Sequence, residues 1–339
     1  MVWIEKYRPR DLCEIQGQDP VMERLSAWAS SRNVPHLLFA GPHGTGKSAT
    51  VECLARKLYG DLWEENTTIL QTAMLFGEGK PYLESEERFA HLFQKDESLI
   101  TNVKYIIRWY SSLQPLDAEF KLMVFEEASA LPLDAQQALR RIMERFSHTC
   151  RFFFCTTNPS AIIPAISSRC FPLFFSSLSE GVILTHLARI RASEGIPRDR
   201  IPEDDLELVA KAAEGDLRRA IMLLQVLAET GKKVDLAQLT VSETATLTSS
   251  ILQFLRKGDL ISAQKTIESL IIDYGLSGRE VLAELSRTVR KEYNEPRLSL
   301  HIAATEQLLV QNGSDFIQLN ALLAQMLEEV FHEKGSGTL

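Results

Sequence analysis

The chain has 339 residues, of which 45% are hydrophobic and 24% are charged, and its net charge is −8. This length favours two or three domains, and the negative charge excludes a surface that attracts nucleic acid as a whole, although a local basic patch remains compatible with it. The five cysteines form no C-x-x-C pair, which argues against a zinc site and against a disulfide framework.

The N-terminal stretch MVWIEKYRPR lacks the features of a signal peptide. No apolar run approaches the roughly 18 residues that a membrane span requires. We therefore expect a cytoplasmic protein with no membrane partner.

Five short runs rich in β-forming residues alternate with helical patterns in the first half of the chain. They are residues 34–41, 67–73, 121–126, 149–157 and 170–175. Short buried strands separated by helices are typical of a parallel sheet, so residues 1–175 are predicted to form an α/β domain with flanking helices.

Residues 73–120 are harder to assign within this domain. We expect two amphipathic helices on its surface, near residues 83–94 and 99–111. Aromatic residues beside Lys104 and Arg108 would suit nucleic acid or a protein partner, but a helix with a buried aromatic face is the favoured interpretation.

Helical patterns dominate the chain after residue 176. Residues 179–195, 202–215 and 216–231 are predicted to form three helices of a second domain, residues 176–240. A polar Ser/Thr-rich passage, residues 241–250, precedes a further helical region that extends to about residue 332. Turns are expected within it at residues 275–280 and 312–315, and the tail after residue 332 is expected to be frayed. This region makes a third, all-α domain, residues 241–339.

The octapeptide GPHGTGKS, residues 41–48, satisfies the pattern G-x-x-x-x-G-K-[ST] between a predicted strand and a predicted helix. Glycines let the backbone N–H groups approach phosphate oxygens, assisted by the positive end of the helix. Lys47 would reach the β- and γ-phosphates of ATP, and the Ser48 hydroxyl would ligate Mg²⁺. The cofactor-binding candidates here are Gly41, Pro42, His43, Gly44, Thr45, Gly46, Lys47, Ser48 and Ala49.

Glu126 and Glu127 end the predicted strand KLMVFE, which can lie beside the strand that precedes the phosphate loop. A carboxylate at this place, here Glu126, would hold Mg²⁺, and its neighbour Glu127 would orient the attacking water. A solvated strand edge is the alternative, which the helical pattern that follows disfavours.

Three further polar residues are candidates for contacts with the phosphates. Asn158 ends a strand and could bond the γ-phosphate or the water, although Asn-Pro is also a good turn on its own. Arg169 and Arg218 could neutralise charge that develops during phosphoryl transfer, although isolated arginines are more often surface charges.

The motifs WIEKYRPR, GPHGTGKS, DAQQALRRIMERF, AIIPAISSRC and EGDLRRAI occur in this order over residues 3–221. Together they closely resemble the small subunits of replication factor C, the clamp loader of archaea and eukaryotes. The resemblance implies a P-loop AAA+ ATPase domain, a helical lid over residues 176–240 and a helical collar over residues 241–339. It also implies five subunits in a ring-like spiral that opens a sliding clamp with ATP and loads it on primer–template DNA.

The same resemblance assigns roles to single residues. Tyr7, Arg8 and Pro9 would lie near the adenine, and Asn158 and Arg218 would be the two sensors of the nucleotide. Arg169 would be the finger that acts in trans on ATP bound to a neighbouring subunit. The protein would be nucleoid-associated in an archaeon and nuclear in a eukaryote.

The chain departs from the family pattern in two places. It has EEAS at residues 126–129 where the family usually has D-E-A-D, and QTAMLFGEG at residues 71–79 where the family usually has N-A-S-D-E-R-G. A longer acidic passage, residues 76–98, adjoins the second. We expect a divergent paralogue and leave three hypotheses open: an active ATPase slowed by Glu126 in place of Asp, a subunit that binds ATP but hydrolyses it weakly or not at all, or an AAA+ ATPase of DNA repair or recombination.

Overall fold

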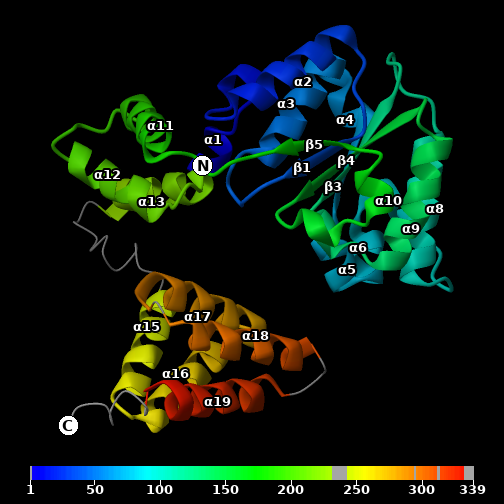
Figure 1. The fold of residues 1–339 in the computed structure, drawn as a ribbon. Coiled ribbons are helices and arrows are strands. Elements are labelled where there is room, and N and C mark those ends of the chain that lie inside the picture. Colours follow the sequence, from blue (N-terminus) through cyan, green and yellow to red (C-terminus); the bar gives the residue numbers. More distant parts are fainter. Residues whose placement is uncertain (1, 231–242, 294, 311–313, 332–339) are drawn as a thin grey trace. The chain divides into compact units, whose positions relative to one another are not determined.

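The structure, a computed structural model, describes residues 2–230, 243–293, 295–310 and 314–331 (Figure 1). The chain divides into two compact units, Met1–Lys232 and Lys233–Leu339. The boundary expected between residues 240 and 241 lies outside the described residues, and the one expected between residues 175 and 176 falls inside the first unit. Both domain boundaries remain predictions. None of the helices in the described ranges has the length and apolar character needed to cross a membrane.

The first unit contains a five-stranded parallel sheet, which confirms the predicted α/β fold. The strands lie in the order β2-β3-β4-β1-β5. Each falls within or close to one of the five predicted runs. They are β1 (Leu37–Ala40), β2 (Thr67–Gln71), β3 (Lys121–Glu126), β4 (Cys150–Thr156) and β5 (Phe171–Phe174).

Helices connect and cover these strands. They are α1 (Trp3–Lys6), α2 (Asp19–Ser31), α3 (Lys47–Tyr59), α4 (Trp63–Asn66), α5 (Thr72–Glu78), α6 (Lys80–Ser85), α7 (Glu87–Ala90), α8 (Leu99–Ser112), α9 (Leu133–Arg145) and α10 (Pro164–Ser167). Figure 1 shows α2 and α3 on one face of the sheet and α8 and α9 on the other.

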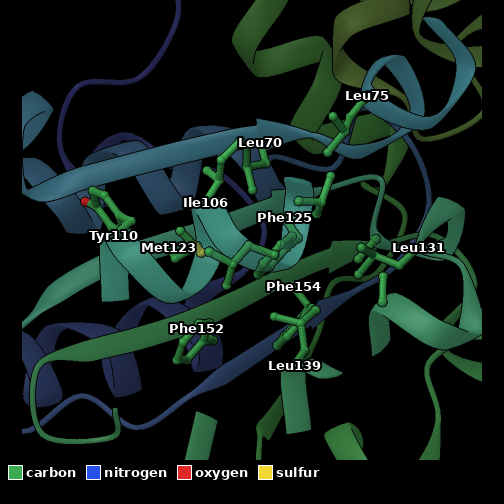
Figure 2. Close-up of a cluster of buried hydrophobic side chains, with 14 of the residues drawn as sticks. Leu70, Leu75, Ile106, Tyr110, Met123, Phe125, Leu131, Leu139, Phe152 and Phe154 are labelled. Atoms are coloured by element: carbon green, nitrogen blue, oxygen red, sulfur yellow. The ribbon is translucent and has the colours of Figure 1, made fainter. Parts of the chain in front are cut away.

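The central strands are apolar on both faces because helices cover both. Along β3, Met123 and Phe125 pack in the cluster beneath α8 and α9, whereas Leu122 and Val124 pack toward α2 and α3. Figure 2 shows the first cluster, in which the ring of Phe125 stacks on that of Phe154 with centroids 5.1 Å apart. These contacts hold β3 and β4 together and fix the positions of their ends.

The strand order corrects one expectation. The strand that ends in the two glutamates does not lie beside β1, because β4 separates β3 from β1. The sequence of a buried strand does not reveal which strands lie beside it, because β1, β3 and β4 are all mainly apolar. The three carboxyl ends still meet at one edge, because the strands are parallel.

The surface segment also differs in part from the prediction. The single helix expected at residues 83–94 is two short helices, α6 and α7, because the backbone of Glu86 is extended (φ −81°, ψ 107°). The second predicted helix is present as α8. It buries Val103, Ile106, Ile107 and Tyr110, leaves Tyr105 and Arg108 exposed, and half-buries Lys104.

The three helices predicted after residue 176 are all present. They are α11 (Glu180–Ser193), α12 (Glu203–Ala212) and α13 (Leu217–Thr230). An apolar face of each is buried, as the periodicity indicated, and Ser179 begins α11 by accepting a hydrogen bond from the N–H of Val182.

The second unit is all-α in the residues described. Its helices are α15 (Glu243–Arg256), α16 (Leu260–Ile272), α17 (Gly278–Glu292), α18 (Pro296–Val310) and α19 (Asp315–Met326), followed by a π-helical turn (Leu327–Phe331). They enclose one apolar core. α17 begins within the predicted turn because Ser277 and Glu280 form a capping box. Of the turn predicted at residues 312–315 only residues 314 and 315 are described, and the tail expected to be frayed lies outside the described residues.

The prediction that the Ser/Thr-rich passage precedes the helical region is wrong, because α15 already begins at Glu243. Its hydroxyls do not compete with the helix, since they bond to the carbonyls one turn earlier. Thr248 donates to the carbonyl of Thr244 and Ser250 to that of Thr246.

His36, just before β1, gives the fold a pH dependence. Its Nδ1 accepts a hydrogen bond from the N–H of Phe152, and burial lowers the pKa of the imidazole to about 4 from its ordinary 6.5. Below pH 6.5 His36 binds a proton in the unfolded chain but remains neutral in the folded chain. The free energy of unfolding therefore falls between pH 6.5 and 4, by at most about 3 kcal/mol.

We predict that His36→Gln flattens this part of the pH profile of the urea midpoint, whereas His148→Gln, at an exposed position, leaves it unchanged. Equal slopes for His36→Gln and the unsubstituted chain would contradict the assignment.

Candidate functional site

A loop between β1 and α3 forms the floor of the site. In it Gly44 and Gly46 have left-handed backbones, with φ of 64° and 97°. The loop delivers the chain into the first turn of α3, whose N–H groups have no partner within the helix. These donors and the helix dipole make the loop suited to an anion such as a phosphate.

Lys47 lies in the first turn of α3 and is nearly buried. Its ammonium donates to the carbonyl of Gly41 at 2.8 Å and to the carbonyl of Pro42. Burial lowers the pKa of Lys47, because the charged form loses hydration. An anionic ligand near this ammonium would stabilise its charged form.

Glu126 lies at the end of β3 with only 9% of its surface exposed. Its Oε2 accepts a hydrogen bond of 2.9 Å from the hydroxyl of Ser48, so the acid reaches the P-loop helix across the end of β4. Burial raises the pKa of Glu126, and hydrogen bonds from Ser48 and Cys155 oppose that rise. The Ser48 proton points to Glu126, which leaves the oxygen lone pairs of Ser48 for a cation.

Glu127 differs from its neighbour in both backbone and environment. It is exposed, and its backbone is left-handed (φ 51°, ψ 46°) at the point where β3 ends. A non-glycine residue in this conformation costs about 1–3 kcal/mol and is often found at functional sites. The turn separates the two carboxylates, so that Glu126 is buried against α3 whereas Glu127 lines the open cavity.

The end of β4 contributes different residues from the one predicted. Cys155, Thr156 and Thr157 line the cavity, but Asn158 does not. The side-chain oxygen of Asn158 accepts a hydrogen bond from the N–H of Ser160 at 3.2 Å, as in the turn that the Asn-Pro pair also favours. The sensor role of Asn158 therefore remains a prediction, and Thr157 is the neighbouring side chain that reaches the cavity.

The N-terminal segment closes another side. Tyr7, Arg8 and Pro9 line the cavity, and the Tyr7 hydroxyl donates to Glu194 at 2.6 Å. Burial, followed by this hydrogen bond, raises the pKa of Tyr7. Because Glu194 follows α11, the segment is tied to the helices after residue 176.

Helix α13 meets the loop directly. The N–H of Leu217 donates to the carbonyl of Gly44 at 3.2 Å, and Asp216 accepts a bond from the N–H of Arg219 at 3.0 Å. A Cβ on Gly44 would lie 1.6 Å from Asp216 Oδ1. An added side chain would therefore force Asp216 to move and would strain a left-handed backbone, and Arg218, two residues after Asp216, lies on the cavity wall.

Together these elements enclose a cavity of about 420 Å³. Of the predicted residues, the structure brings thirteen to its wall: Tyr7, Arg8, Pro9, His43, Gly44, Thr45, Gly46, Lys47, Ser48, Ala49, Glu126, Glu127 and Arg218. Gly41 and Pro42 are not on the wall, but their carbonyls accept the hydrogen bonds of the Lys47 ammonium.

Arg169 lies apart from the wall. Its Nε donates to Glu144 Oε1 at 3.0 Å, and it is bound to residues of α9 and α10. The structure therefore does not bring Arg169 to the cavity of its own chain.

Sequence reasoning missed mainly the apolar side of the cavity, which includes Ile4, Ile15, Leu178, Leu217 and Ile221. Such residues have no motif of their own, but several adjoin motif residues in sequence. His186 of α11 is also on the wall, with a buried Nε2 that has no hydrogen-bond partner in the described part of the chain. Burial lowers the pKa of His186.

The donors present fit a magnesium ion held mainly by phosphates. Among the described residues, no three His, Cys, Asp or Glu side chains gather into a metal site. Mg²⁺ is commonly held by one or two protein oxygens together with waters and substrate phosphates, and Ser48 and Glu126 can supply those oxygens.

Comparisons with known proteins cover nearly the whole chain. Residues 17–179 match the family model described as DNA polymerase III, delta subunit, and residues 244–325 match the replication factor C C-terminal domain. The chain is 34% identical to the replication factor C small subunit of Archaeoglobus fulgidus over 96% of this chain and 97% of that protein. It is 34% identical to the replication factor C small subunit of Methanocella arvoryzae over 95% of each chain.

Among solved structures, a mutant of RuvB from Thermotoga maritima matches with a TM-score of 0.52. It is 18% identical, and the match covers 85% of this chain and 89% of that one. At this identity the likeness shows the fold alone.

The contact between Gly44 and Asp216 can be tested by adding one methyl group. Gly44→Ala should lower the affinity of the cavity for a nucleotide by about 10-fold or more, about 1.4 kcal/mol, because the new Cβ displaces Asp216 and strains the loop. Titration with a fluorescent ATP analogue measures the change.

Gly181→Ala is the matched control, since its added methyl group meets nothing within 4 Å. Unchanged affinity in Gly44→Ala would show that this contact does not shape the site.

Proposed function

Because the chain belongs to the replication factor C small-subunit family, we propose that it is an ATP-hydrolysing subunit of a clamp loader, which places a sliding clamp on primed DNA. One observation carries the proposal: near-full-length similarity to that family coincides with a cavity where Lys47, Ser48 and both glutamates meet. ATP and Mg²⁺ are the cofactors that such a cavity suits.

The phosphates of ATP would lie along the loop of residues 41–48. The N–H groups at the start of α3 would bond their oxygens, and Lys47 would exchange its carbonyl contacts for the β- and γ-phosphates. Ser48 and Glu126 would hold Mg²⁺ beside these phosphates. When bound, the metal would neutralise charge on the phosphate oxygens.

Glu127 is the residue that we assign to the attacking water. Its carboxylate is exposed at the cavity wall, whereas that of Glu126 is bound to Ser48. A water held by Glu127 would be oriented toward the γ-phosphate. Arg218, at the start of α13, would stabilise charge on the γ-phosphate.

The base would occupy the end of the cavity formed by the N-terminal segment. Tyr7, Arg8 and Pro9 lie there with the apolar side chains of Ile4 and Ile15. A mainly apolar wall with a few polar groups suits a purine ring.

The proposed partners are other clamp-loader subunits, large and small, a sliding clamp and primer–template DNA. A chain of net charge −8 needs a local basic surface to contact DNA phosphates. Helix α9 offers Arg140, Arg141 and Arg145 at exposed positions. These are the kind of residues that follow a phosphate backbone without reading sequence.

The second candidate function is a subunit that binds ATP and hydrolyses it slowly or not at all. The observation that favours it is Glu126 itself. Its side chain is one methylene longer than that of aspartate, and Mg²⁺ requires near-ideal octahedral geometry. At 18% identity the likeness to RuvB shows the fold alone and favours no other function.

Assembly tests the proposed function. The chain, copurified with candidate co-subunits, should form a hetero-oligomer by native mass spectrometry, and its ATPase rate should rise when sliding clamp and primed DNA are both added. A stable complex whose ATPase rate does not change when clamp and DNA are added would contradict the clamp-loading proposal.

Glu126→Asp distinguishes the two candidate functions. If the longer acid slows hydrolysis, the aspartate variant should turn over about 10-fold faster in the assembled complex, equivalent to about 1.4 kcal/mol of barrier. ATP affinity should stay within about 2-fold, since Lys47 and the loop are unchanged.

Glu127→Gln is the control, because removing that acid should abolish the turnover of this site in both backgrounds. No acceleration in Glu126→Asp would refute the argument from side-chain length.

A further inference from the structure

The guanidinium of Arg169 is held by an unusually complete set of acceptors. Nε donates to Glu144 Oε1 at 3.0 Å, and Nη2 donates to the same oxygen. Nη1 donates to the carbonyl of Ala165 at 2.7 Å and weakly to the Ser168 hydroxyl at 3.4 Å. Four of the five N–H groups of the side chain are thus engaged by its own chain.

These acceptors come from two different elements. Glu144 belongs to α9, whereas Ala165 belongs to α10, and Arg169 itself follows α10. The hydrogen bond from Arg169 lowers the pKa of Glu144, so the carboxylate remains ionised at neutral pH. Arg140, one turn earlier on α9, is a more distant partner, with its Nε 3.7 Å from Glu144.

This ion pair is at the surface, and its value for folding is small. The side chain of Arg169 is 32% exposed and that of Glu144 is 48% exposed. Pairs with this exposure contribute little to stability because water and salt screen them. A pair of little value for folding still fixes the plane of a guanidinium on a long and flexible side chain.

The geometry leaves the distal end of the guanidinium usable. One N–H of Nη2 has no acceptor among the described residues, and the weak contact from Nη1 to Ser168 can be exchanged. Two N–H groups at this end could grip a phosphate while Glu144 and Ala165 keep their bonds. The arginine is therefore oriented before a partner arrives, which lowers the entropic cost of engagement.

We propose that Glu144 is a positioning residue, which holds Arg169 in the orientation that reaches ATP on a neighbouring subunit. The inference rests on the proposed function, in which Arg169 acts in trans. Glu144 touches no nucleotide in this arrangement, and its effect passes through Arg169 alone.

The test measures steady-state ATPase in the assembled complex with clamp and primed DNA. Glu144→Ala should lower kcat by about 10-fold and leave KM for ATP within about 2-fold, because orientation is lost while binding is not. Glu144→Gln, which keeps an acceptor oxygen at the same reach, should recover part of kcat. An unchanged or raised kcat in Glu144→Ala, or a change confined to KM, would overturn the proposal.

A double-mutant cycle separates positioning from a general structural effect. Adding Glu144→Ala to Arg169→Ala should produce no further loss, since both act through one guanidinium. Asp134→Ala, an exposed acid on the same helix, is the matched control and should leave kcat within about 2-fold. A further loss in the double variant would show that Glu144 acts by another route.

The same variants distinguish failure of this inference from failure of the proposed function. Arg169→Ala should leave the isolated chain's own ATP affinity unchanged and impair the assembled ATPase. If Arg169→Ala has no effect in the assembly, or abolishes ATP binding by its own chain, the trans role fails. If Arg169→Ala impairs the assembly and Glu144→Ala does not, only the positioning role fails.

Discussion

The hydrogen bond from Ser48 to Glu126 joins the P-loop helix to the third strand, and the site depends on it. The two residues are 78 positions apart: Glu126 ends β3, Ser48 lies in α3 after β1, and β4 lies between β3 and β1. Their contact requires that β1, β3 and β4 be parallel and end at the same edge. The aromatic core around Phe125 and Phe154 secures that register, since a shift of one residue would turn Glu126 to the opposite face.

A second constraint links the loop to the helices after residue 176. Gly44 has no room for a side chain because Asp216 occupies that space, and the N–H of Leu217 bonds to the Gly44 carbonyl. The N-terminal segment is tied to the same helices through Tyr7 and Glu194. A movement of these helices would therefore alter the loop of residues 41–48 and the cavity wall formed by the N-terminal segment together. In a nucleotide-driven machine this coupling would transmit the state of the site.

The two adjacent glutamates prove to be unlike in environment. Glu126 is buried and bound to Ser48, whereas Glu127 sits in a left-handed turn and is exposed to the cavity. The strain at Glu127 is consistent with a position kept for chemistry rather than stability, because a glycine would adopt that backbone at lower cost.

Sequence alone determined what local chemistry dictates: five strands, the phosphate loop, most helices and a family resemblance carried by short motifs. Prediction from the sequence failed where contacts between distant segments determine the structure. The place of β4 between β1 and β3 follows from packing of equally apolar strands. The capping bond of Asn158 and the access of Thr157 depend on how one turn closes, and the bond between Arg169 and Glu144 joins residues 25 positions apart. Motifs record which groups a site needs, whereas only tertiary packing decides which of them meet.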